Sequence, residues 1–207
     1  MKNWAVFGKT GGLGSGCIDY LKSINEPVTG FGRSDLDFAD TTAVANFDLS
    51  PYTHVINCTG TSRGTYLGFI NNSVENIVSQ MTVNYVNNIV LLKNFVNTNP
   101  QGHYTWIGTS LSSHGQRPFH SIYASSKEAC VTATALIAQE ATDFTITEAR
   151  VGPVATKFRW VNFDGSRTQE EVQQDYNSGN AMTSESVAIS IVDAILANKT
   201  YLEKFND

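Results

Sequence analysis

Basic residues, cysteines and long apolar stretches are all scarce in this chain of 207 residues. The 14 Lys and Arg residues are outnumbered by 19 Asp and Glu, the net charge is −5, and no long run of basic residues occurs. This balance argues against a nucleic-acid partner, because binding to phosphates requires a clustered basic face. No stretch approaches the ~20 apolar residues of a membrane-spanning helix, so no membrane partner is expected.

The three cysteines, Cys17, Cys58 and Cys130, lie far apart and form no C-x-x-C pair. They suggest neither a disulfide framework nor a zinc knuckle, and buried thiols in a reducing cytosol are the expectation. The histidines form no H-E-x-x-H pattern, so no metal site is expected. The first residues pass directly into a predicted strand and a glycine loop without the apolar segment of a signal peptide, so the predicted location is cytoplasmic.

Short apolar runs alternate with longer helical segments along the chain, which is typical of a parallel α/β sheet. The length suits one domain with a sizeable core, and we predict a single domain over residues 1–207. Its predicted fold class is α/β, a Rossmann-like doubly wound parallel sheet of about six to seven strands with helices on both faces. The predicted strands are 4–7, 27–31, 52–58, 104–109 and 144–151, and the predicted helices are 12–24, 39–47, 74–97 (as one or two helices), 123–142, 169–176 and 184–197.

Two segments are ambiguous. Residues 36–38 are a candidate third strand, but only three residues separate Gly32 from Leu36, too few for a crossover helix. Residues 200–205 are either a reduced edge strand or a tail.

A glycine-rich segment with the spacing G-x-x-x-G-x-G lies between the first predicted strand and the first predicted helix. Glycines let the chain turn tightly and let a pyrophosphate approach the backbone, where the helix N-terminus supplies N–H groups. Such turns also end strands for conformational reasons alone, but this position favours dinucleotide binding. The loop residues predicted to bind the cofactor are Gly8, Lys9, Thr10, Gly12, Leu13 and Gly14.

Arg33 follows the second predicted strand, where a doubly wound fold meets the adenosine ribose. An arginine there would pair with a 2′-phosphate, so NADP(H) is preferred and NAD(H) stays an alternative. A solvated surface arginine is the other interpretation. If Asp35 lies at the ribose instead, the preference would relax or reverse.

Tyr123 and Lys127 form a Y-x-x-x-K pair in a predicted helix, where residues four apart share one face. Ser110 ends the strand before that helix, and Asn84 lies in the preceding helical segment. A lone Y-x-x-x-K pair is common and can be a surface pair. A glycine loop, Asn84, Ser110 and the pair in this order are not an expected coincidence.

Together these motifs resemble the short-chain dehydrogenase/reductase superfamily, from Val6 to about Ala188. The resemblance implies that Tyr123 is the general acid/base of a hydride transfer. Lys127 and the positively charged oxidised nicotinamide would lower the pKa of Tyr123, and Lys127 would also bind the nicotinamide ribose. It also implies that Ser110 donates to the substrate oxygen and that Asn84 holds a water through its main chain. The further cofactor residues that it implies are Asp37 and Phe38 beside the adenine, Asn57, Thr59 and Gly60 in the fourth predicted strand, and Gly152, Val154 and Thr156 after the strand that ends at 151.

The resemblance predicts an NADP(H)-dependent oxidoreductase acting on a small-molecule carbonyl or secondary alcohol. A 3-oxoacyl thioester or sugar-type dehydrogenase is an alternative, and a catalytically silent dinucleotide-binding regulator is an alternative of another class. A substrate lid is expected over 157–180, and a homodimer or homotetramer is expected to form through the helices around Asn84 and Tyr123. Five further side chains either lie on the surface or contact the substrate: Arg63, Arg117, Arg159, His114 and His120.

Overall fold

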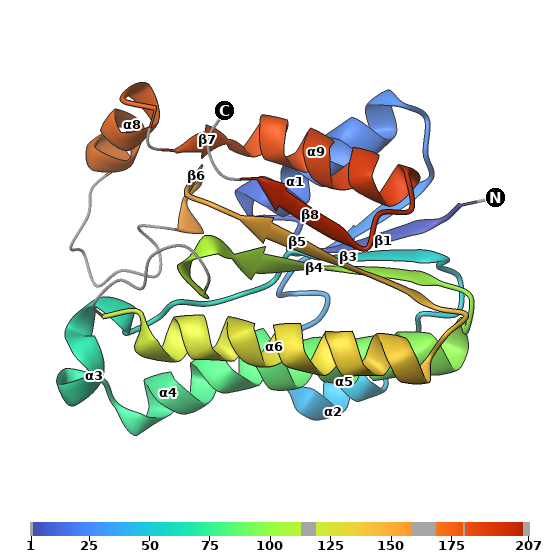
Figure 1. Ribbon diagram of the computed structural model, residues 1–207, viewed down its shortest axis with the longest axis horizontal. Coiled ribbons are helices and arrows are strands. Elements are labelled where there is room, and N and C mark those ends of the chain that lie inside the picture. Colours follow the sequence, from blue (N-terminus) through green and yellow to red (C-terminus); the bar gives the residue numbers. More distant parts are fainter. Residues whose placement is uncertain (1, 113–118, 159–168, 180, 205–207) are drawn as a thin grey trace.

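A computed structural model describes residues 2–112, 119–158, 169–179 and 181–204 (Figure 1). Its main sheet has six strands in the order β2-β1-β3-β4-β5-β8, and every neighbouring pair is parallel. The strands are β1 (Trp4–Phe7), β2 (Val28–Phe31), β3 (His54–Asn57), β4 (His103–Thr109), β5 (Thr145–Val151) and β8 (Tyr201–Lys204), and β6 (Val154–Ala155) pairs separately with β7 (Met182–Thr183). The predicted doubly wound parallel sheet is confirmed.

Helices lie on both faces of the sheet (Figure 1). Helices α1 and α9 cover one face, and α2, α5 and α6 cover the other. The helices are α1 (Gly12–Ser23), α2 (Thr41–Ala45), α3 (Gly68–Asn71), α4 (Val74–Met81), α5 (Asn87–Thr98), α6 (Ser121–Glu140), α8 (Gln169–Asn177) and α9 (Ser184–Leu196), with the 3-10 turns η1 (Thr65–Leu67) and η3 (Ser110–Ser112) and the π-helical turn η2 (Thr82–Val86).

Strand β1 explains why the sheet needs both layers. Trp4 and Val6 pack in the cluster under α1 and α9, whereas Ala5 and Phe7 pack in the cluster under α2, α5 and α6. Successive side chains of a strand point to opposite faces, and here all four are buried. A strand that is apolar on both faces can only lie in the middle of a layered α/β fold.

The candidate third strand at 36–38 is not a strand. Leu36 and Phe38 are buried, but the backbone forms turns in which the Leu36 N–H donates to the carbonyl of Gly32. Three residues cannot carry the chain to a new parallel position, so the apolar side chains fold back onto the core and β2 stays at the edge of the sheet. At the opposite edge, Tyr201–Lys204 is a strand that pairs with Glu148–Val151 of β5.

The predicted helical segment 74–97 consists of two helices joined by η2, and Asn84 lies inside that turn. Ser73 caps α4, because its Oγ accepts a hydrogen bond of 3.2 Å from the N–H of Asn76. Across the described ranges, no helix is both long and apolar enough to cross a membrane. Nor do three His, Cys, Asp or Glu side chains of the described residues gather into a group that could hold a metal ion.

Candidate active site

A cavity of about 510 Å³ opens where the carboxyl ends of β1, β3, β4 and β5 meet. This edge is where ligands bind in open α/β sheets. The predicted site residues that line it are Gly12, Leu13, Gly14, Thr59, Gly60, Ser110, Tyr123, Lys127, Gly152, Val154 and Thr156. The predicted residues that do not line it are Gly8, Lys9, Thr10, Arg33, Asp37, Phe38, Asn57 and Asn84.

The glycine loop forms the wall of this cavity at the start of α1. Gly8 has φ +86°, a conformation that favours glycine, and a Cβ on Gly14 would collide with the Gly8 carbonyl. A Cβ on Gly12 would lie 2.5 Å from the Thr156 methyl group. No side chain caps the N-terminus of α1, and its first residues, Gly12, Leu13 and Gly14, line the cavity. This loop suits an anionic phosphate group.

The end of β2 carries an arrangement that the sequence did not reveal. The carboxylate Oδ2 of Asp35 lies 2.6 Å from the Lys9 ammonium and accepts a hydrogen bond of 2.8 Å from the Gly32 N–H. These two donors, the Gly32 N–H first, lower the pKa of Asp35. Arg33 is exposed beside them. The positive charge of Lys9 is therefore already engaged by a carboxylate of the same chain.

Two predicted adenine contacts differ in their surroundings. Phe38 packs in the core, with its ring 5.8 Å from that of Phe7, and its carbonyl accepts a hydrogen bond from Asn87. Its side chain is thus part of the core beside Phe7 and does not line the cavity. Asp37 is exposed, and its carboxylate accepts a hydrogen bond from the N–H of Ala39.

Asn57 acts within the protein rather than in the cavity. Its amide group donates to Asn88 Oδ1 at 2.8 Å and to the Tyr104 hydroxyl at 3.1 Å. Its oxygen accepts from the Thr59 N–H and from the Thr59 hydroxyl, at 3.0 and 2.6 Å. Asn57 therefore fixes the turn that brings Gly60 to the cavity.

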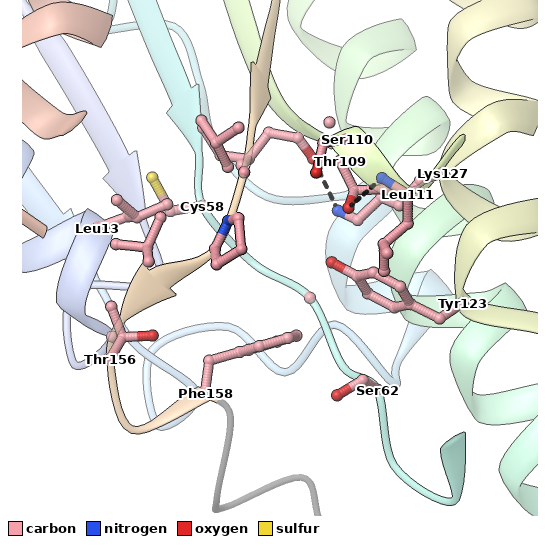
Figure 2. A pocket seen from close by; sticks show the side chains of 18 of the residues that line it. Leu13, Cys58, Ser62, Thr109, Ser110, Leu111, Tyr123, Lys127, Thr156 and Phe158 are labelled. Atoms are coloured by element: carbon pink, nitrogen blue, oxygen red, sulfur yellow. Dashed lines mark hydrogen bonds between the residues drawn. The ribbon is translucent and has the colours of Figure 1, made fainter. Parts of the chain in front are cut away.

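Tyr123 and Lys127 lie on one face of α6 and both line the cavity (Figure 2). Lys127 is buried, and its Nζ donates a hydrogen bond of 2.9 Å to the carbonyl of Ile107 on β4. Burial lowers the pKa of Lys127. Burial also raises the pKa of Tyr123 to about 12, although a hydrogen bond with the Thr109 side chain acts in the opposite direction.

In the protein without a cofactor the pKa of Tyr123 is therefore raised, and its lowering in the presence of the oxidised nicotinamide stays a prediction. Desolvation disfavours the phenolate more than neighbouring groups favour it, and Lys127 is turned toward Ile107. Ser110 follows β4 directly, as predicted, and shares this wall of the cavity (Figure 2).

Asn84 is buried behind this wall and holds two elements together. Its amide donates to the Thr61 carbonyl at 2.8 Å and to Ser126 Oγ at 3.0 Å, while its Oδ1 accepts from the Thr61 N–H at 2.8 Å. Its main-chain carbonyl, expected to hold a water, accepts a hydrogen bond from the Cys130 thiol at 3.2 Å. Asn84 thus connects the loop after β3 to the helix that carries Tyr123.

Some predictions fall on residues that cannot be described. His114, Arg117 and Arg159 lie outside the described residues, as do residues 159–168 and 180 of the predicted lid. Arg63 is exposed and does not line the cavity, whereas His120 does.

Several residues that line the cavity were not predicted from the sequence, of which Ser62, Leu111 and Phe119 matter most. They lie in irregular segments without periodicity, and their nearness in sequence to Gly60, Ser110 and His120 was the one available signal. Phe158, which also lines the cavity, belongs to the lid expected over 157–180.

Known structures with this fold were found, although no protein-family model and no curated protein matches the chain. A small-chain dehydrogenase solved with NADPH is 16% identical, with a TM-score of 0.82 over 99% of this chain and 96% of that one. A short-chain dehydrogenase from Burkholderia cenocepacia solved with NADP is 15% identical (TM-score 0.79, 99% and 96%). A short-chain dehydrogenase/reductase from Burkholderia phymatum solved with NAD is 15% identical (TM-score 0.75, 98% and 88%). The chain has the fold of the short-chain dehydrogenases.

Proposed function

We propose that the chain is a short-chain dehydrogenase/reductase that transfers hydride between NADP(H) and a carbonyl or secondary alcohol substrate, with Tyr123 as general acid/base. One observation carries the proposal: Tyr123, Lys127 and Ser110 line the same cavity as the glycine loop. A dinucleotide whose phosphates lie at that loop would reach these side chains with its nicotinamide end. The solved structures with this fold that contain NADPH, NADP or NAD support this assignment.

The residues present fit a nicotinamide dinucleotide. The N–H groups at the start of α1 suit the pyrophosphate, and the glycines there carry no side chain that would block it. Gly60 and Gly152 keep the middle of the cavity open. Val154 and Thr156 would hold the carboxamide end. When bound, the nicotinamide ring supplies or accepts the hydride.

The side chains of the protein supply orientation and a proton. Ser110 would donate a hydrogen bond to the substrate oxygen and stabilise the negative charge that develops on it. Tyr123, kept neutral by burial, would give its phenolic proton to that oxygen during reduction and take it back during oxidation. Lys127 would orient the ribose through its ammonium group. Phe158, whose ring centroid lies 6.2 Å from that of Tyr123, would help to exclude water.

The preference for NADP(H) rests on Arg33, an exposed cation directly beyond β2. A 2′-phosphate there would meet Arg33 and the Lys9–Asp35 pair. Because Asp35 offsets the charge of Lys9, we infer a moderate preference for NADP(H) and retained binding of NAD(H). Calorimetric titration with NADPH and NADH side by side tests this preference.

Turnover by the Tyr123→Phe variant tests the catalytic assignment. The substitution removes one oxygen atom, so cofactor binding should persist while reduction of a carbonyl panel falls by ~100-fold or more. A wild-type protein that binds NADPH tightly but shows no turnover would favour the alternative of a silent dinucleotide-binding regulator. The contact of Lys127 with Ile107 rather than with Tyr123 is the observation in favour of that alternative.

We also infer a homodimer or homotetramer in the cytoplasm. Val78 on α4, Val86 on η2 and Leu136 on α6 are exposed apolar residues on the helices around Asn84 and Tyr123. The three cysteines are free, and Cys17 lies within hydrogen-bond reach of Cys58, an arrangement suited to a reducing compartment. Sedimentation of the wild type beside Leu136→Glu tests the assembly: a shift of the wild-type oligomer to monomer in the variant is expected, and a wild-type monomer would refute it.

A further inference from the structure

Ser62 presents a buried hydroxyl group with nothing to bind. Its Oγ has no hydrogen-bond partner among the described residues, and the residue is 4% exposed. Other buried polar atoms share this property, but those residues, Asn72, Asn87, Thr105 and Trp106, do not line the cavity. Ser62 does, and its hydroxyl points into the space between Tyr123 and Phe158 (Figure 2).

The position of Ser62 is fixed by the residues on both sides. Asn84 binds the main chain of Thr61 twice, at 2.8 Å each. Gln80, which is fully buried, donates a hydrogen bond of 2.8 Å to the carbonyl of Arg63. The carbonyl of Ser62 itself accepts from the N–H of Thr65 at 3.0 Å. Two buried amides thus hold the backbone around a hydroxyl that they leave free, which is how a binding group is prepared for a ligand.

Apolar and aromatic side chains line the cavity that Ser62 also lines. They include Leu111, Phe119 and Phe158, and the ring centroid of Phe158 lies 6.2 Å from that of Tyr123. Among the described residues that line the cavity there is no Asp, Glu or Arg, and the one lysine, Lys127, donates to the Ile107 carbonyl and is assigned to the cofactor ribose. Apart from Lys127, the described lining offers no charged Asp, Glu, Lys or Arg side chain to pair with a charged substrate. A planar ring, in contrast, can pack against the aromatic side chains.

We propose that Ser62 is a substrate-binding residue that hydrogen-bonds a hydroxyl group on an uncharged aromatic aldehyde or ketone. This inference rests on the proposed function, because the carbonyl of that substrate is placed between Ser110 and Tyr123. Ser62 then provides the second polar contact, and the aromatic side chains enclose the ring. A buried polar group without a partner is rare in folded proteins, and a ligand that satisfies it gains discrimination against analogues that cannot.

Matched pairs of substrates test this assignment. The 3- and 4-(hydroxymethyl)benzaldehydes differ from the 3- and 4-methylbenzaldehydes by one hydroxyl group. For at least one isomer, wild-type kcat/KM should be about fivefold higher with the hydroxymethyl compound, the effect of one net hydrogen bond. In Ser62→Ala this ratio should fall to about one. Ser23→Ala is the matched control, because Ser23 is exposed at the end of α1 and bonds only locally to Tyr20.

Two further measurements separate a binding role from a structural one. The melting temperature of Ser62→Ala should equal or exceed that of the wild type, since the hydroxyl makes no bond in the folded protein. The Kd for NADPH should also be unchanged. A lower melting temperature with an unchanged substrate ratio would mean that Ser62 is structural, and a weaker Kd for NADPH alone would place its partner on the cofactor.

Three further outcomes would contradict the role of Ser62, the substrate class or the proposed function. An equal ratio in wild type and Ser62→Ala contradicts the inference. If NADPH binds and other carbonyl compounds of the panel are reduced but none of these four aldehydes is, the substrate class is wrong while the proposed function stands. If NADPH does not bind, both fail.

Discussion

The amide group of Asn84 lies 3.0 Å from the hydroxyl of Ser126, and that hydroxyl donates to the carbonyl of Tyr123 at 2.7 Å. The same asparagine holds Thr61, the neighbour of Ser62, through both its amide and its oxygen. One buried side chain therefore sets the distance between the loop after β3 and the helix α6. Both walls of the cavity depend on this link.

Asn84→Ala should reduce both stability and turnover. It removes the two hydrogen bonds that Asn84 makes with the main chain of Thr61, which contribute about 0.5–1.5 kcal/mol each. The displaced wall should lower kcat by ~10-fold or more. Urea unfolding and steady-state kinetics measure the two effects.

The matched control for that variant is Asn94→Ala. Asn94 also donates to two backbone carbonyls, of Val44 and Phe47, but it lies away from the cavity. The Asn94→Ala variant should be less stable than the wild type and should keep the wild-type kcat. Equal kcat losses in the two variants would show that Asn84 acts through general stability alone.

Reduction and oxidation should depend differently on pH. With a Tyr123 pKa of about 12, the phenol keeps its proton over the whole working range, so the reductive kcat should be flat from about pH 6 to about pH 9. Oxidation needs the phenolate, so its rate should rise by up to ~10-fold per pH unit over the same range. Stopped-flow measurements in both directions test this. A reductive rate that falls above neutral pH would show that the cofactor lowers the tyrosine pKa substantially.

The protein should lose stability in mild acid through a pair of histidines. His54 and His103 have ring centroids 5.7 Å apart, and burial lowers the pKa of each to about 4 from 6.5. A lowered folded-state pKa means that the unfolded chain binds protons first. The stabilisation is therefore complete above about 6.5 and is lost as the pH falls toward about 4.

For His103 the loss between about pH 7 and about pH 5 is about 2 kcal/mol. The free energy of unfolding in urea at the two pH values measures it. His103→Gln loses the contact with Thr147, at 2.6 Å, and so starts from a lower stability, but its pH dependence should be shallower. If the free energy of unfolding falls equally with pH in the variant and the wild type, His103 is not the source of the acid destabilisation.

Asp35→Asn should shift the cofactor preference further toward NADPH. The substitution removes the negative charge that lies beside Lys9 and leaves the Lys9 ammonium available to a 2′-phosphate. The affinity for NADPH should rise by about fivefold, and that for NADH should change little. Asp48→Asn is a suitable control, because Asp48 also accepts a hydrogen bond from a backbone N–H in an exposed turn. The same gain in NADPH affinity for Asp48→Asn would show that the effect comes from the change in net charge rather than from the release of Lys9.

The regular elements and the common helix face of Tyr123 and Lys127 were predictable because each leaves a periodic or spaced signal. The Tyr123–Lys127 pair follows from helical spacing, and β1 follows from an apolar run beside a glycine loop. The ion pair of Lys9 with Asp35 was not predictable, because it depends on how a shortened connection turns. The burial of the Phe38 ring against Phe7 was not predictable for the same reason.

The most direct test of the account is a calorimetric titration of the purified protein with NADPH and NADH side by side. Both nucleotides should bind to the protein, and NADPH should bind more tightly because its 2′-phosphate pairs with Arg33. Binding of NADH alone would overturn the role of Arg33 and place Asp35 at the ribose. Binding of neither would show that this fold no longer holds a dinucleotide and would contradict the proposed function.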